Sequence, residues 1–130
     1  MARNPVIPSK GRVSPFFSPA VRSGRLLFVS GQAAIDEQGQ VVAPGDCAAQ
    51  SEYIMDRLRT VLEAAGAGFD DVVKTTTFLT NAADYSAYNS VRARCFPKDP
   101  PASSTVIVAA LVVPGLVVEV EAVAELPGDG

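Results

Sequence analysis

The chain has 130 residues, of which 48% are hydrophobic and 19% are charged. This composition is typical of one compact domain with a sizeable core, and it argues against a disordered chain. The net charge is −3 and the eleven Lys and Arg residues are scattered, whereas nucleic-acid-binding surfaces usually carry a basic stripe. No segment approaches the roughly 18 consecutive apolar residues of a membrane span, and no apolar run forms a secretion signal. We therefore expect a cytoplasmic protein with neither nucleic acid nor a membrane as partner.

The sequence contains no histidine and only two cysteines. Without an imidazole, the chain cannot form a Ser-His-Asp or Cys-His site, nor the common zinc sites that use histidine. Cys47 and Cys95 fall on separate predicted helices with no second ligand nearby, so we interpret both as buried thiols. We expect no metal and no organic cofactor. Acid–base chemistry then falls to carboxylates, hydroxyls, backbone groups or water.

The first half of the chain predicts an arm, a hairpin and a helix. Residues 1–14 combine prolines and charges without periodicity, which indicates an irregular N-terminal arm before a single domain over residues 15–127. Two runs of strand formers on either side of a Ser-Gly turn predict a β-hairpin over 20–30, and Val41-Val42 could form a short strand. Apolar residues recur at helical spacing over 46–65, with Asp46 as the cap and a glycine after the end.

The second half predicts a strand, a helix and two further strands. A β-branched run over 72–80 suits a central strand. The next helix extends to Phe96, where prolines follow, and one of its faces carries Tyr85, Tyr88, Arg92 and Cys95. The last two strands, 104–111 and 116–125, flank a Pro-Gly turn. This order predicts an α+β fold with a mixed sheet and both helices on one face, and the uncovered apolar face favours oligomerisation.

Four ordered motifs resemble the Rid family, the reactive-intermediate deaminases also called the YjgF family. They are Ser-Gly-Gln at 30–32, the run at 71–79, Pro-Ala-Ser-Ser-Thr-Val at 101–106 and Val-Glu-Val-Glu-Ala at 118–122. The resemblance extends from about Pro15 to Ala124. It implies a chorismate-mutase-like fold assembled as a homotrimer, with small-molecule metabolites bound in clefts between the subunits.

Several candidate site residues follow from these motifs. The two-residue period of a strand places Glu119 and Glu121 on the face away from the helices, where they are either ordinary surface carboxylates or cleft residues. The resemblance implies that Glu119 lies in the cleft and positions or activates water. It also implies that the backbone of Ser30 and Gly31 approaches the ligand. Asn89 matches a family position on the second helix, and Thr105 occupies a site often held by Cys, where it could bind ligand or simply satisfy the strand.

Two positions depart from the family pattern. Ser103 stands where the imine deaminases carry an Arg that grips the substrate carboxylate, and Phe16 stands where they usually carry a Tyr. A neutral hydroxyl cannot replace a bidentate guanidinium, so we expect a less cationic pocket that suits a bulkier or neutral ligand and binds small α-imino acids weakly. The alternative is that another cation, Arg22 or Arg92, enters the cleft.

The sequence thus predicts a hydrolytic, deaminase-like enzyme that acts on an enamine, an imine or a related reactive metabolite with non-standard substrate recognition. A non-catalytic trimeric protein that binds or senses a metabolite is the alternative. Ribonuclease activity, a label sometimes attached to this family, fits less well because the chain lacks histidine and a basic track.

Overall fold

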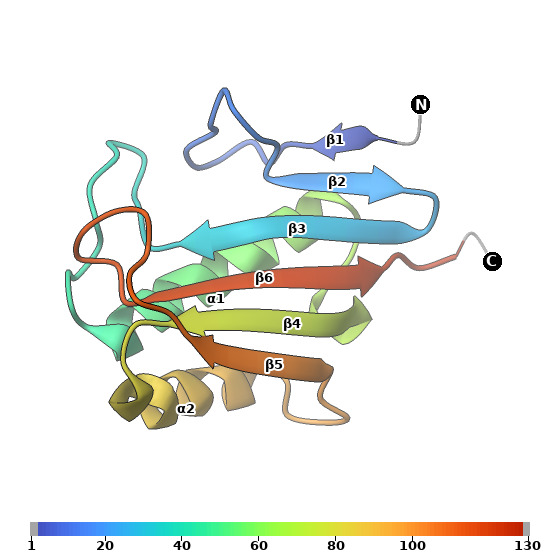
Figure 1. The fold of residues 1–130 in the computed structure, drawn as a ribbon. Coiled ribbons are helices and arrows are strands. Elements are labelled where there is room, and N and C mark those ends of the chain that lie inside the picture. The colour runs from blue at the N-terminus through green and yellow to red at the C-terminus, as the bar shows by residue number, and fades with distance from the viewer. Residues whose placement is uncertain (1–2, 129–130) are drawn as a thin grey trace.

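The structure is a computed structural model that describes residues 3–128. Within this range one sheet and two α-helices form two layers (Figure 1). The strands are β1 (Asn4–Val6), β2 (Ala20–Ser23), β3 (Leu26–Ala33), β4 (Val72–Leu79), β5 (Ala102–Ile107) and β6 (Val118–Glu125). The α-helices are α1 (Cys47–Ala64) and α2 (Tyr85–Cys95), and short 3-10 helices cover Phe69–Asp71 and Ala82–Asp84.

The sheet is mixed and has the strand order β1-β2-β3-β6-β4-β5. β4 and β5 pair in parallel, whereas the other neighbours pair antiparallel. The C-terminal strand β6 therefore lies between β3 and β4, and both helices lie on the same side of the sheet (Figure 1). This arrangement confirms the predicted α+β fold with two helices on one face.

The core lies between the helices and the sheet. On β6 the residues Val118, Val120, Ala122 and Ala124 are buried, and the glutamates between them face the other way. The apolar stripe of α1 packs against this layer and includes Ile54, Leu58, Val61 and Leu62. The alternation on β6 and the helical spacing on α1 agree with the predictions from the sequence.

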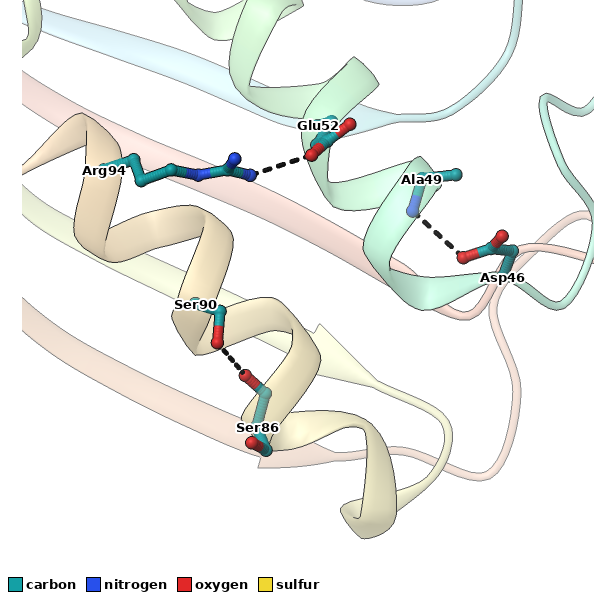
Figure 2. Close-up of polar contacts among 6 residues, drawn as sticks. All are labelled: Asp46, Ala49, Glu52, Ser86, Ser90 and Arg94. Atoms are coloured by element: carbon teal, nitrogen blue, oxygen red, sulfur yellow. Dashed lines mark hydrogen bonds and ion pairs between the residues drawn. The ribbon is translucent and has the colours of Figure 1, made fainter.

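Polar contacts fix the helix layer. The Asp46 carboxylate accepts a hydrogen bond from the Ala49 N–H at 3.0 Å and so caps α1 as predicted. Arg94 on α2 pairs with Glu52 on α1 at 2.8 Å (Figure 2). The fully buried amide of Gln50 accepts from the Val117 N–H at 2.9 Å and donates to the carbonyl of Gly115 at 2.8 Å. The loop before β6 is thereby fastened to α1.

Three local predictions differ from the structure. The strand predicted at 104–111 is β5 at Ala102–Ile107, because its partner β4 ends at Leu79 and the chain beyond has no ladder to continue. The Val41 segment forms only an isolated bridge with Ile35. In addition, the arm expected to be irregular contains β1, which pairs with β2.

The sheet face opposite the helices carries both apolar and polar side chains. Leu26, Phe28 and Val106 are 40–46% exposed, and Phe78 and Val123 lie half-buried on the same face. Polar side chains, including those of Thr76 and Glu121, stand among them. Among the described residues, neither helix has the length and apolar character needed to cross a membrane.

Candidate functional site

Four of the seven predicted site residues line two separate cavities of the single chain. The Glu119 cavity, of about 320 Å³, is lined by Gly31 and Glu119. The Arg92 cavity, of about 310 Å³, is lined by Asn89, Arg92 and Ser103. Glu119 pairs with Phe78 on the open face of the sheet, whereas Ser103 pairs with the buried Thr75 on the helix side. The fold therefore places the two groups on opposite faces of the sheet.

In the Glu119 cavity the carboxylate lies against a glycine. A Cβ atom on Gly31 would fall 2.7 Å from Glu119 Oε2 and 2.8 Å from its Cδ, closer than real Cβ contacts come. The carboxylate therefore occupies the space that a side chain at position 31 would take. β6 holds Glu119 between β3 and β4, where its register partners are Ala33 and Phe78.

The surroundings of Glu119 change its acidity. Burial, reinforced by the neighbouring Glu121 carboxylate, raises the pKa of Glu119 above its ordinary value. A carboxyl group with a raised pKa exchanges its proton closer to neutral pH, which suits a general acid or base. Glu119 is thus a carboxylate that both lines a cavity and has a raised pKa.

Two arginines that sequence reasoning missed also line the Glu119 cavity. Arg12 comes from the N-terminal arm and Arg57 from α1. Arg57 Nη1 donates to the carbonyl of Lys10 at 2.9 Å, and its guanidinium occupies the space beside Gly11, where φ is +100°. The arm is therefore tied to α1. Local sequence gave no signal of this, because the contact joins residues 47 positions apart.

The Arg92 cavity is organised by one face of α2. Tyr85, Asn89 and Arg92 follow one another at helical spacing, so their side chains meet. Arg92 Nη1 donates to Ser103 Oγ on β5 at 2.7 Å. Nε and Nη2 donate to Asn89 Oδ1 at 3.2 and 2.7 Å, and Nη2 also donates to the Tyr85 hydroxyl at 3.1 Å.

The guanidinium of Arg92 rests on an anchored ring. Its Cζ lies 4.9 Å from the centroid of the fully buried Tyr88 ring, within the range of a cation–π contact. The Tyr88 hydroxyl in turn accepts a hydrogen bond from Thr77 Oγ1 at 2.6 Å. A guanidinium from the helix thus reaches the Ser103 hydroxyl, as in the alternative in which Arg92 supplies the cation, and the less cationic ligand pocket stays a prediction.

The other proposed cation lies elsewhere. Arg22 is exposed on β2, and its Nε donates to the carbonyl of Gly24 at 3.0 Å in the hairpin turn. Arg22 lines neither cavity. Of the two alternatives to an Arg at position 103, the structure favours Arg92.

The remaining predicted residues have different positions. Ser30 Oγ donates to the carbonyl of Ser18 at 2.6 Å and so fastens the segment before β2 to β3. Phe16 is 91% exposed and lines neither cavity, whereas the adjacent Phe17 lines the Glu119 cavity. Thr105 is half-buried on β5 beside Thr77 and lines neither cavity.

The cysteines and acidic residues show no further chemical site. Cys47 is buried as predicted and Cys95 is half-buried, and burial raises the pKa of both thiols, which disfavours the nucleophilic thiolate. Between residues 3 and 128, no group of three or more His, Cys, Asp or Glu residues is arranged to hold a metal ion.

Thr75 is a further residue that the sequence did not single out. It lines the Arg92 cavity, it is fully buried, and its Oγ1 has no hydrogen-bond partner among the described residues. Buried hydroxyls are nearly always paired in folded proteins. The unpaired hydroxyl therefore marks this cavity as a place where a polar partner can bind.

Comparisons with known proteins agree with this architecture. The family model described as Endoribonuclease L-PSP matches residues 11–126. The protein DfrA of Myxococcus xanthus is 41% identical over 110 residues, which are 83% of this chain and 83% of DfrA. The crystal structure of RidA from the Antarctic bacterium Psychrobacter superposes with a TM-score of 0.86 at 31% identity, over 95% of this chain and 100% of RidA.

A further match connects the chain with the wider family. The crystal structure of Rv2704 from Mycobacterium tuberculosis is described as a member of the YjgF/YER057c/UK114 family. It superposes with a TM-score of 0.80 at 34% identity and covers 95% of this chain and 99% of that one. The family model spans nearly the whole chain, and the mixed sheet with its two helices matches the solved structures of these relatives. The chain therefore belongs to the Rid (YjgF/YER057c/UK114) family and has its fold.

Proposed function

We propose that the protein is a Rid-type hydrolase that converts an enamine or imine of a small metabolite into a carbonyl compound and ammonia. The observation that carries this proposal is the Glu119 carboxylate, which lies against Gly31 in a cavity and whose pKa is raised by burial. Membership of the Rid family supports the same reaction class.

The proposed reaction needs one water molecule and one proton-transfer group. An enamine first tautomerises to the imine, and water then adds to the carbon of the C=N bond. Glu119 accepts a proton from the attacking water and gives it to the nitrogen, which yields a neutral carbinolamine. In a second transfer Glu119 moves the proton of the carbinolamine hydroxyl to the amine, so that ammonia leaves as the C=O bond forms. A carboxyl group with a raised pKa performs both transfers more readily near neutral pH than an ordinary carboxylate does.

The proposal includes a homotrimer in which neighbouring copies complete the site. Glu119 and Ser103 lie on opposite faces of the sheet of one chain, so a ligand that contacts both needs two copies. The exposed Phe28 and Val106 give the open face apolar area that another copy can bury. We propose that the Glu119 cavity of one subunit adjoins the Arg92 cavity of its neighbour in a cytoplasmic trimer.

Turnover of a defined imine tests the function. We expect the purified protein to accelerate the release of ammonia from 2-iminopropanoate generated in situ by an amino-acid oxidase. Glu119→Gln should lower kcat/KM about a hundredfold, within the usual range for loss of a general acid–base group. Glu121→Gln, a variant of the neighbouring exposed carboxylate, is the matched control and should retain most activity.

The same assay separates the two functions predicted from the sequence. If the wild type binds small metabolites but does not accelerate hydrolysis above the rate of the Glu119→Gln variant, the protein is a metabolite-binding member of the family. A stable monomer with full activity would contradict the shared site and leave the hydrolytic role of Glu119 in place.

A further inference from the structure

The Arg92 cavity contains a guanidinium whose charge is not matched by a carboxylate. Elsewhere on the helices, Arg94 pairs with Glu52 at 2.8 Å and Arg59 pairs with Asp56. Arg92 forms no ion pair within residues 3–128, and its partners are an amide and hydroxyls. A half-buried cation held only by neutral groups retains its attraction for an anion.

The neutral partners of Arg92 add further donors. Nε, Nη1 and Nη2 together donate four hydrogen bonds, to Asn89, Ser103 and Tyr85. A hydroxyl that accepts a hydrogen bond from the guanidinium still has its own proton to donate, and the Asn89 amide keeps its NH₂ group. Because hydrogen bonds in a chain polarise one another, such donors strengthen the attraction of the cluster for an anion.

The geometry of Arg92 is fixed before any ligand binds. The guanidinium packs on the ring of Tyr88 and bonds to β5 through Ser103, so the helix and the strand both hold it. A guanidinium held in one orientation loses little conformational freedom on binding and recognises planar oxoanions better than a mobile ammonium does.

Other parts of the same cavity suit a small organic acid. The buried Thr75 Oγ1 has no partner and can bind one oxygen or nitrogen of a ligand. Ala93, Phe96, Pro100 and Pro101 supply apolar walls for a short carbon chain. At about 310 Å³, the cavity is at the lower end of the range for small-molecule sites.

We propose that Arg92, supplied by α2, is the residue that recognises the carboxylate of the substrate in this protein, with Ser103 as its positioning partner on β5. The inference rests on the proposed function and narrows its substrate class to small α-imino monocarboxylates. It replaces the expectation, drawn from Ser103 alone, that such substrates bind weakly.

Binding equilibria test Arg92 without requiring turnover. Isothermal titration calorimetry on the whole protein should show that pyruvate, the ketone counterpart of 2-iminopropanoate, binds at least tenfold more tightly than the neutral analogue 2-oxopropanamide. Arg92→Gln should weaken pyruvate binding about ten- to a hundredfold, because hydrogen bonds between a guanidinium and a carboxylate are stronger than those between neutral groups. Arg94→Gln, on the same helix but paired with Glu52, is the matched control and should bind pyruvate like the wild type.

A double variant that moves the positive charge from residue 92 to residue 103 distinguishes loss of the charge from misfolding. In the double variant Arg92→Gln with Ser103→Arg, the new guanidinium projects from the strand position that now contacts Arg92, so pyruvate binding should recover to within about tenfold of the wild type. Ser103→Arg alone should not improve binding, because it places two like charges together. Circular dichroism and light scattering on each variant confirm folding and assembly.

The outcomes distinguish this inference from the proposed function. If Arg92→Gln, folded and assembled, binds pyruvate like the wild type, Arg92 is not the recognition residue, whatever the hydrolytic activity. If Arg92→Gln loses binding and the double variant regains it while no imine is hydrolysed, the anion site stands and the proposed enzyme activity fails.

Discussion

The contact between Gly31 and Glu119 shows how a missing side chain can make room for a carboxylate. The carboxylate lies where a Cβ on residue 31 would be, and β6 fixes the backbone of Glu119 from both sides. The backbone at Gly31 lies outside the left-handed region, so an L-residue can adopt its conformation. Steric room for Glu119, and not backbone conformation, is therefore the reason for glycine at this position.

Gly31→Ala should consequently impair activity more than folding. The added methyl group must push the flexible Glu119 side chain aside, and we expect kcat/KM for imine hydrolysis to fall at least tenfold while the melting temperature changes little. Gly68→Ala is a suitable control, because a Cβ there meets no atom within 4 Å. Full activity of a folded Gly31→Ala variant would show that the carboxylate does not need its observed position.

The raised pKa of Glu119 predicts how stability depends on pH. The folded state holds the Glu119 proton up to a higher pH than the unfolded chain, whose pKa is about 4.3. Between these two pKa values the folded state binds more protons, so stability falls as pH rises through that window. Glu119→Gln removes this effect, and its unfolding free energy relative to the wild type should increase between pH 4 and 8. Urea denaturation at both pH values measures the difference, and a constant difference would contradict the raised pKa.

Thr75 allows stability and binding to be separated. Thr75→Val keeps the shape of the side chain and removes the unpaired hydroxyl, so the ligand-free protein should become more stable by about 1 kcal/mol. Pyruvate affinity should fall if this hydroxyl contacts the ligand. Thermal unfolding with and without pyruvate measures both effects, and a destabilised variant would show that Thr75 Oγ1 already has a partner.

At the scale of single elements, α2 depends on buried polar contacts more than on an apolar stripe. Tyr88 and Val91 are its buried residues, and Tyr88 reaches the central strand β4 through Thr77. Tyr88→Phe leaves the buried Thr77 Oγ1 without its acceptor and should destabilise the fold by about 1–3 kcal/mol. Adding Thr77→Val should recover part of this loss, because both polar groups are then absent, and urea denaturation of the single and double variants tests it. Simple additivity would show that the two hydroxyls are not coupled.

Strands and helices whose apolar residues recur at a regular spacing could be predicted from the sequence. The contacts between these elements could not. The alternation on β6 identified its buried and open faces, and the spacing on α2 placed Tyr85 and Arg92 on one side. The bond from Arg92 to Ser103 depends on how α2 lies against β5, which no local pattern contains. The end of β5 was likewise set by its partner strand and not by its own β-branched residues.

At the scale of the whole molecule, the divided site and the open sheet face both support the proposed assembly of several copies. Phe28 is 46% exposed on this face, and Glu119 lies on the same side of the sheet. Phe28→Asp should convert the proposed trimer to monomers in multi-angle light scattering and lower hydrolysis at least tenfold. Ala48→Asp adds the same charge on the exposed surface of α1 and should leave the assembly intact. A trimeric Phe28→Asp variant would show that this face is not the interface.

The bond between Arg92 and Ser103 affects how activity should be inferred across relatives of this protein. A positive charge can be contributed from either of two backbone segments that meet in space, so a substitution at one position is interpretable only together with the residue at the other. A search that asks only whether position 103 is basic would overlook the guanidinium of Arg92 beside it. Under the proposed role of Arg92, scoring positions 92 and 103 as a pair would place this chain beside proteins that carry the charge on the strand.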